Sequence, residues 1–142
     1  MRYKLLKREE EKRRVEDLRR ELSHLKSTSD YYLDRLLNNQ MYAMGAYNEN
    51  ELIGVVYFHK MFEDILEIDK LFVIPEYAES NLRDLMISKI LQSKERFENI
   101  VGEPLVKCVV ETESRFEKVV YSRQGFVPTA LDNSVLSNKF IK

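Results

Sequence analysis

The spacing of apolar and polar residues along this chain changes period several times, and each change predicts a new element of secondary structure. Apolar residues three and four apart, as in Val15, Leu18, Leu22 and Leu25, predict an amphipathic helix. Runs rich in β-branched and aromatic residues, bounded by polar turns, predict strands. The predicted helices cover 9–26, 31–38, 81–99 and 115–123, and the predicted strands cover 2–6, 41–47, 52–60, 65–74, 105–110, 126–130 and 135–141.

Proline, glycine and capping residues mark the ends of these elements. Pro75 ends the strand at 65–74 because proline has no N–H for the ladder. Gly102 is expected to stop the long helix, and Ser114 can cap the last one. An apolar strand that follows a helix, as 105–110 does, indicates a parallel crossover. The element order β-α-α-β-β-β-α-β-α-β-β predicts an α/β fold, a mixed sheet in a single domain over residues 1–142.

The helix predicted over 81–99 has one apolar face. This face is formed by Leu82, Leu85, Met86, Ile90 and Phe97. A strand that feeds such a helix through a short turn directs backbone N–H groups at whatever lies above the helix start, which suits an anion. The turn at 78–81, however, contains no glycine and carries the carboxylate of Glu79. The architecture therefore predicts an anion-binding junction, while the residues of the turn argue against tight binding.

Composition narrows the class of protein. With 142 residues, 44% hydrophobic and 33% charged, the chain is long enough to bury a core and has a heavily charged surface. No apolar run approaches the ~20 residues of a membrane span, and the N-terminus lacks the apolar core of a secretory signal. We therefore expect a cytoplasmic protein with no membrane partner. One cysteine, Cys108, excludes an intrachain disulfide, and with two distant histidines it predicts no metal site.

The net charge of −1 conceals an uneven distribution. Residues 1–26 hold ten Lys/Arg and six Asp/Glu, so this segment is +4 and the remainder is −5. A basic segment can mark a nucleic-acid surface. Acids interleaved with the bases at helical spacing are more typical of a solvated helix face. We therefore favour a solvated helix face over a nucleic-acid surface; the alternative is a nucleic-acid-associated protein that uses Arg13, Arg14, Arg19 and Arg20.

Three local motifs, taken in order, resemble those of the GNAT superfamily of acyl-CoA-dependent N-acyltransferases. The segment LFVIPEY at 71–77 resembles the end of the family's fourth strand, and the helix from Asn81 follows it. The segment YSRQGF at 121–126 is similar to the family's helix that ends in a tyrosine and then a Gly-Phe pair. The element order resembles the family's over nearly the whole chain. The resemblance implies a sheet whose fourth and fifth strands splay apart and admit the pantetheine arm of acetyl-CoA.

The resemblance also implies which residues bind this acyl donor. Backbone groups of Leu71, Phe72 and Val73 would pair with the pantetheine amides, and Ser114 stands where relatives often have a cofactor-contacting asparagine; the alternative role for Ser114 is a helix N-cap. The pyrophosphate would rest on the turn and first helical residues Ala78, Ser80, Asn81, Leu82 and Arg83. Family members usually have an Arg or Gln and then glycines in this turn, and this chain departs from that pattern.

Acyl transfer to an amine requires a base for the ammonium and an acid for the leaving thiolate. Tyr121 matches the position of the family's acid, although a tyrosine on the inner face of a late helix is also an ordinary core residue. Glu67 and Asp69 share one strand face with Ile65, Leu71 and Val73, which makes them candidates for the base. The alternative is that this face is open to solvent near the start of the strand.

The leading interpretation is an N-acetyltransferase that passes an acetyl group from acetyl-CoA to a primary amine of a small molecule or protein. The alternative is a catalytically inactive GNAT-fold protein that acts through protein–protein contacts. A homodimer is compatible with either interpretation.

Overall fold

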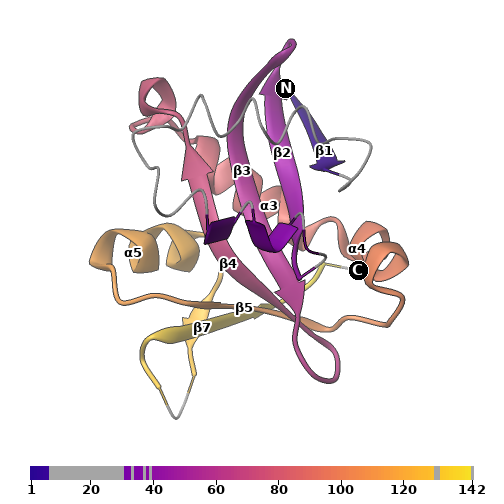
Figure 1. Ribbon diagram of the computed structural model, residues 1–142. Helices are drawn as coiled ribbons and strands as arrows, with labels where there is room; N and C mark the ends of the chain where they lie inside the picture. The colour runs from indigo at the N-terminus through magenta and orange to yellow at the C-terminus, as the bar shows by residue number, and fades with distance from the viewer. Residues whose placement is uncertain (7–30, 33, 37, 39, 130–131, 142) are drawn as a thin grey trace. The chain divides into compact units, whose positions relative to one another are not determined.

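The computed structural model describes residues 1–6, 31–32, 34–36, 38, 40–129 and 132–141, and the following account refers to these residues (Figure 1). The helix predicted over 9–26 lies outside them. Of the helix predicted over 31–38, the described residues 31–32 and 34–36 are helical. Among the described residues, no helix combines the length and apolar character that crossing a membrane requires.

The seven strands follow one another in the sheet in the order β1-β2-β3-β4-β5-β7-β6. Their bounds are Arg2–Leu6 (β1), Tyr42–Asn48 (β2), Glu51–Lys60 (β3), Ile65–Val73 (β4), Lys107–Glu111 (β5), Val127–Pro128 (β6) and Val135–Lys139 (β7). β1 with β2, β2 with β3, β5 with β7 and β6 with β7 are antiparallel, whereas β4 and β5 are parallel. The predicted crossover between β4 and β5 is thus confirmed, and the fold is the predicted mixed α/β type.

The described helices after β4 are the 3-10 turn η2 and three α-helices. Their bounds are Pro75–Tyr77 (η2), Leu82–Leu91 (α3), Lys94–Val101 (α4) and Arg115–Arg123 (α5). Contacts between Cα atoms divide the chain into two compact units. The first comprises Met1–His59 and Lys70–Glu79, and the second comprises Lys60–Asp69 and Ser80–Lys142. β4 contributes residues to both units, and each unit is described by itself below.

The first unit contains the antiparallel meander β1-β2-β3. Residues 52–58 of β3 are all buried, which explains why this segment reads as a continuous apolar run and not as an alternation. The Ile74 N–H donates to the Ile53 carbonyl at 3.0 Å, so the chain leaving β4 is tied to β3. The ring of Tyr57 lies 6.1 Å from that of Phe72 and 5.3 Å from that of Tyr32. This aromatic cluster fills part of the core of the first unit.

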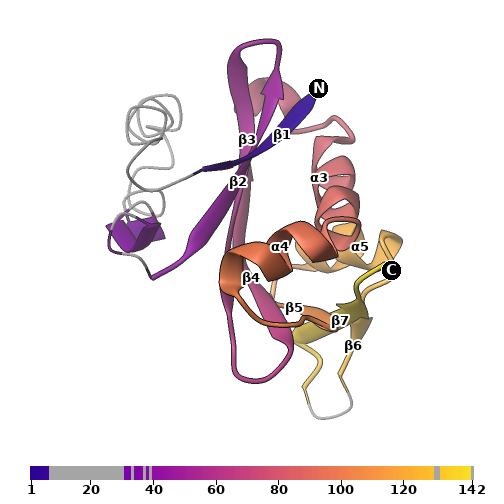
Figure 2. The same ribbon diagram turned by 90° about the vertical axis from the view of Figure 1, so that its right-hand side faces the viewer.

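The second unit contains β5, β6 and β7 together with α3, α4 and α5, and α3 packs against α5 (Figure 2). Cys108 of β5 is fully buried, and burial raises the pKa of its thiol. Cys108 is therefore the small core residue that its mid-strand position predicts. Phe97 of α4 is also fully buried, with its ring 6.4 Å from that of Phe140.

The single helix predicted over 81–99 is wrong, because the structure has two helices that break at Gln92 and Ser93. The Ser93 hydroxyl donates to the Lys89 carbonyl at 2.6 Å, and the Ser93 N–H turns to the Ile90 carbonyl at 3.1 Å. A serine side chain that competes for backbone groups in this way favours the end of a helix. Helix α4 then starts with Ser93 as its N-cap residue.

The apolar face predicted for this helix is partly wrong as well. Leu82, Met86, Ile90 and Phe97 are buried as predicted, but Leu85 is 41% exposed. The buried face of α3 also includes two residues outside the predicted face, Ile87 and Leu91. Because α3 buries neighbouring positions, a narrow stripe spaced at three and four residues underestimates its core side.

The predicted helix ends are confirmed where a single residue sets the backbone. Gly102 ends α4 in the left-handed region with φ of 76°, and Gly125 follows α5 with φ of 90°. The carboxylate of Glu98 in α4 accepts hydrogen bonds from the Leu105 N–H at 2.7 Å and from the Lys94 ammonium at 3.0 Å. The backbone hydrogen bond from Leu105 holds the pKa of Glu98 below its ordinary value, with a smaller contribution from Lys94.

Candidate functional site

The parallel pairing of β4 with β5 is short. It runs from Ile65 opposite Lys107 to Ile68 opposite Val110, whereas β4 itself continues to Val73. Within the described strands, no β4 residue beyond Ile68 is in register with β5. The predicted contact of pantetheine amides with the backbone of 71–73 requires such a short register. The contact itself stays a prediction.

The two faces of β4 differ in burial over most of the strand. Leu66 and Ile68 are essentially inaccessible, while Ile65, Glu67, Asp69 and Leu71 are half-buried. Only near the end of the strand are consecutive residues, 72 and 73, both buried. This burial agrees with the alternative that the Glu67 face is open to solvent near the start of the strand, and not with a core face over 65–71. Glu67 and Asp69 lie on a half-buried face, where a carboxylate stays within reach of a substrate amine or of water.

The turn between β4 and α3 has an ordinary backbone. Residues 75–77 form η2, and Ala78 continues it with φ of −59° and ψ of −34°. Among the described residues, positive φ occurs at Glu49, Glu63, Gly102 and Gly125, and thus not in this turn. Glycine is favoured where φ is positive. The lack of glycine in the turn therefore agrees with the backbone it adopts.

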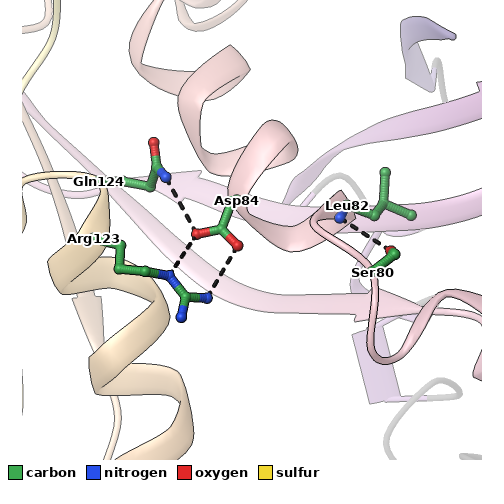
Figure 3. Close-up of polar contacts among 5 residues, drawn as sticks. All are labelled: Ser80, Leu82, Asp84, Arg123 and Gln124. Carbon is green, nitrogen blue, oxygen red and sulfur yellow. Dashed lines mark hydrogen bonds and ion pairs between the residues drawn. The ribbon is translucent and has the colours of Figure 1, made fainter.

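The Ser80 side chain satisfies one backbone N–H at the start of α3, as Figure 3 shows. Its hydroxyl oxygen accepts the Leu82 N–H at 3.1 Å. Asn81 occupies the N-cap position without a capping hydrogen bond from its side chain, while its carbonyl accepts the Leu85 N–H at 3.0 Å. Residues 78–81 are exposed, and Leu82 is buried. The first turn of α3 therefore presents N–H groups that no carbonyl of the helix accepts, one of which Ser80 satisfies.

A carboxylate one turn into α3 ties this helix to α5. Asp84 accepts hydrogen bonds from Nε and Nη2 of Arg123 at 3.1 and 3.0 Å and from Nε2 of Gln124 at 3.2 Å (Figure 3). The hydrogen bond from Arg123 is the largest cause of a pKa below the ordinary value at Asp84. Asp84 is the only acidic residue in the first turn of α3. The Arg123 guanidinium pairs with it in a bidentate manner and largely neutralises the negative charge of its carboxylate.

The Asp84 carboxylate predicts a pH-dependent contribution to stability. Because its pKa is lower in the folded protein, the pair stabilises the fold above the unfolded value near pH ~4 and stops doing so as pH falls through the folded value. We expect Asp84→Asn to lower the free energy of unfolding by about 0.5–1 kcal/mol at pH 7, a small effect since Arg123 is 55% exposed. Urea unfolding of both proteins at pH 7 and in acid measures this difference, which should shrink in acid; a constant difference would contradict the assignment.

Tyr121 lies on the inner face of α5. Its side chain is 5% exposed, and its ring packs edge-on against Phe126 at 5.2 Å. Burial raises the pKa of Tyr121 above its ordinary value, with smaller contributions from Cys108 and Glu117, and Arg83 opposes the rise. The phenol is therefore protonated at neutral pH, the state that a general acid requires.

The predicted capping role of Ser114 is confirmed, since its hydroxyl oxygen accepts the Glu117 N–H at 3.2 Å. The Thr112 hydroxyl donates to the Glu117 carboxylate and accepts the Ser114 N–H at 3.2 Å. The pattern Ser-x-x-Glu is the sequence signal of a capping box, in which the Glu side chain accepts the N–H of the capping serine. In this structure the Thr112 hydroxyl accepts that N–H instead. A contact of Ser114 with a cofactor stays a prediction.

No family model matches the sequence, and no curated protein matches it. Solved structures do match. Tetrahymena GCN5 superposes with a TM-score of 0.73 at 11% identity, over 99% of this chain and 97% of that one. A putative acetyltransferase of the GNAT family from Desulfovibrio desulfuricans gives 0.72 at 12% identity over 99% of both chains. At these identities the likeness is one of fold.

Other structures with this likeness contain nucleic acid. AtaT complexed with acetyl-methionyl-tRNAfMet has a TM-score of 0.64 at 12% identity over 82% of both chains, and a KacTA–DNA complex also matches. The expectation that nucleic acid is not a partner gains no support from these neighbours. The short β4–β5 register, the strand–turn–helix junction and the superposition over almost the whole chain agree with one another: this chain has the fold of the GNAT superfamily.

Proposed function

We propose that the protein transfers an acetyl group from acetyl-CoA to a primary amine. The observation that carries this proposal is the short parallel register, which ends at Ile68 while β4 runs on to Val73 in a fold shared with a GNAT acetyltransferase candidate over 99% of both chains. A strand edge without a neighbour in register offers backbone groups to a ligand that carries amides of its own.

The acyl donor is proposed to bind through backbone groups at two places along the chain. The amides of its pantetheine arm pair with Leu71–Val73 of β4. Its pyrophosphate accepts N–H groups in the first turn of α3, where the helix dipole favours an anion. Arg123 supports this arrangement because it neutralises Asp84, the carboxylate of that turn.

Acetyl-CoA supplies a thioester whose carbonyl carbon an amine attacks, with cleavage of the carbon–sulfur bond. Glu67 or Asp69 accepts the proton that the amine must lose, directly or through a water molecule. Tyr121 donates a proton to the departing thiolate sulfur and recovers one from solvent. The phenol carries the proton at neutral pH, and the burial that raises its pKa makes this proton harder to donate, so the step relies on its position beside the leaving sulfur.

Titration calorimetry with acetyl-CoA, followed by an assay of thiol release with a set of primary amines, tests this proposal. We expect saturable binding, and thiol release that depends on both the protein and the amine. A ligand that binds the folded state also raises the melting temperature. No heat and no thermal shift at millimolar acetyl-CoA would overturn the proposal.

A second candidate is a GNAT-fold protein that does not transfer acyl groups. It is favoured by one observation, the exposed carboxylate of Glu79 in the turn where a pyrophosphate would lie. This candidate acts through protein–protein contacts, and absence of acetyl-CoA binding would support it.

The charge of Glu79 can be tested separately from the shape of the turn. We expect Glu79→Gln to tighten acetyl-CoA binding about fivefold at low salt, because it removes a repulsion between like charges, and the gain should shrink as salt screens it. Glu95→Gln is the matched control, since Glu95 is an exposed carboxylate in the first turn of α4. Equal effects of the two variants on the Kd would show that Glu79 does not face the donor.

A further inference from the structure

The half-buried face of β4 continues across β5 and β7, within the second unit. Residues that lie opposite each other in neighbouring strands point to the same side of the sheet. The register therefore defines an outer face, which comprises Ile65, Glu67, Lys107, Val109, Ser137 and Lys139. The residues between them point to the core and are buried, namely Leu66, Ile68, Cys108, Val110 and Leu136. The outer face is half-buried or exposed at every one of its positions.

Two lysines lie directly opposite each other on the outer face, where β5 and β7 run side by side (Figure 1). Lys107 of β5 is in register with Lys139 of β7, and both are exposed. At the adjacent position, the Phe140 N–H donates to the Val106 carbonyl at 3.0 Å. Hydrogen-bonded and non-hydrogen-bonded positions alternate along an antiparallel pair, so the two lysines occupy a position of the second kind, where opposite side chains are closest. Like charges placed in this way destabilise a sheet.

No carboxylate offsets this repulsion. Among the described residues, no Asp or Glu forms an ion pair with Lys107 or Lys139, and the acid Glu103 pairs with Lys60 instead. On β4, the residue opposite Lys107 is Ile65, which is uncharged. Two adjacent ammonium groups without a counter-charge favour an anion that carries two negative charges. Lysine is a common phosphate ligand, and a phosphate has enough oxygens to accept from both ammonium groups.

The candidate base lies on the same face, one row of residues away from the lysines. Glu67 follows Ile65 by two residues on β4, and its partner in register, Val109, follows Lys107 by two residues on β5. Two residues of a strand span about 7 Å. An acceptor with its amine at Glu67 therefore reaches the lysines with a group about 7 Å from that amine.

We propose that Lys107 and Lys139 bind a phosphate of the acceptor, which makes the acceptor a phosphorylated primary amine; this inference rests on the proposed function. The amine nitrogen forms the bond to the acetyl carbon and gives its proton to the base, and coenzyme A leaves as the thiol. The phosphate stays between the two lysines and takes no part in the reaction. Its negative charges replace the repulsion between the two ammonium groups by attraction.

Kinetics with two matched acceptors test this inference. 4-Aminobutyl phosphate and 4-amino-1-butanol have the same amine and the same carbon chain, and only the first carries a phosphate. We expect kcat/KM to be about 20-fold higher for the phosphorylated amine, mainly through a lower KM, because the phosphate is held equally in the ground state and the transition state. Equal kcat/KM values for the two acceptors would overturn the inference.

Substitution of either lysine assigns the effect to this site. Lys107→Gln and Lys139→Gln should each lower kcat/KM for 4-aminobutyl phosphate about fivefold, the upper range for an exposed ion pair, and leave that for 4-amino-1-butanol unchanged. Arg96→Gln is the matched control, since it removes one positive charge from an exposed position of α4 in the same unit. If Arg96→Gln lowers kcat/KM as much as the lysine variants do, net charge explains the effect and the subsite does not exist.

Melting temperatures measured without acetyl-CoA separate this inference from the proposed function. At low salt, Lys139→Gln should raise the melting temperature of the free protein by about 1–2 °C, because it removes a repulsion. 4-Aminobutyl phosphate should raise the melting temperature of the wild-type protein but not that of the double variant Lys107→Gln/Lys139→Gln. This pattern supports the subsite even where no acetyl transfer is measured. An equal rise in both proteins, or none in either, overturns the subsite and leaves acetyl transfer to other amines intact.

Discussion

Replacement of Tyr121 by phenylalanine is expected to lower kcat for acetyl transfer about a hundredfold and to leave the Kd for acetyl-CoA unchanged. The reason is the loss of a proton donor for the leaving thiolate, a role that typically contributes two to four powers of ten. Packing should survive, because phenylalanine keeps the ring that contacts Phe126. Steady-state kinetics and calorimetry on the same preparations measure the two quantities.

Tyr3→Phe is a suitable control for this experiment. Tyr3 lies half-buried on β1, where partial burial raises its pKa, so the variant removes a phenolic hydroxyl from another part of the fold. A kcat within twofold of wild type in Tyr121→Phe would remove this tyrosine from the mechanism. The raised pKa of Tyr121 adds a check. Deprotonation of this phenol should not lower the rate at any pH up to ~10, the ordinary pKa of tyrosine.

The largest effect on stability is expected for Gly125→Ala, about 2–3 kcal/mol in the free energy of unfolding. Gly125 has φ of 90°, a conformation that costs other residues about 1–2 kcal/mol. A Cβ here would also lie 2.9 Å from Nδ2 of Asn138. That amide donates to the Gln124 carbonyl at 2.9 Å, so the neighbour cannot move without losing a hydrogen bond.

A second glycine separates the backbone cost from the steric one. Gly102 has φ of 76°, but no atom lies within 4 Å of an added Cβ. We expect Gly102→Ala to cost about 1 kcal/mol, the backbone cost alone. Urea unfolding of both variants measures the difference. Equal losses would show that Asn138 moves aside freely, and a double variant with Asn138→Ala should recover the steric part.

Features set by one residue and its nearest neighbours could be predicted from the sequence. Pro75 ends β4, Gly102 ends α4, and Ser114 caps α5, because a fixed or permissive φ and a short polar side chain act within a few residues. The break at Ser93 was missed for a related reason. Serine is tolerated within helices, and whether its hydroxyl takes a backbone carbonyl depends on the surrounding structure.

Only those parts of the candidate site that are contiguous in sequence could be predicted. The strand–turn–helix junction belongs to a contiguous motif and is present where the sequence predicts it; Tyr121 lies on the inner face of α5, and its role in catalysis stays a prediction. The pair Asp84–Arg123 could not be predicted, since it joins α3 to α5 and leaves no periodic signal along the sequence. Its residue types are also ordinary for solvated helix faces, so only the packing of α3 on α5 distinguishes it.

The salt bridge at Asp84 has a geometric consequence. Arg123 and Tyr121 lie two residues apart on one rigid helix, and Asp84 fastens that helix to the first turn of α3. An anion seated on α3 and the phenolic proton would thus be held at a set separation, whatever occupies the rest of the site. Weakening the Asp84–Arg123 salt bridge would therefore leave the anion site on α3 and the phenol of Tyr121 each unchanged, but the distance between them would no longer be fixed.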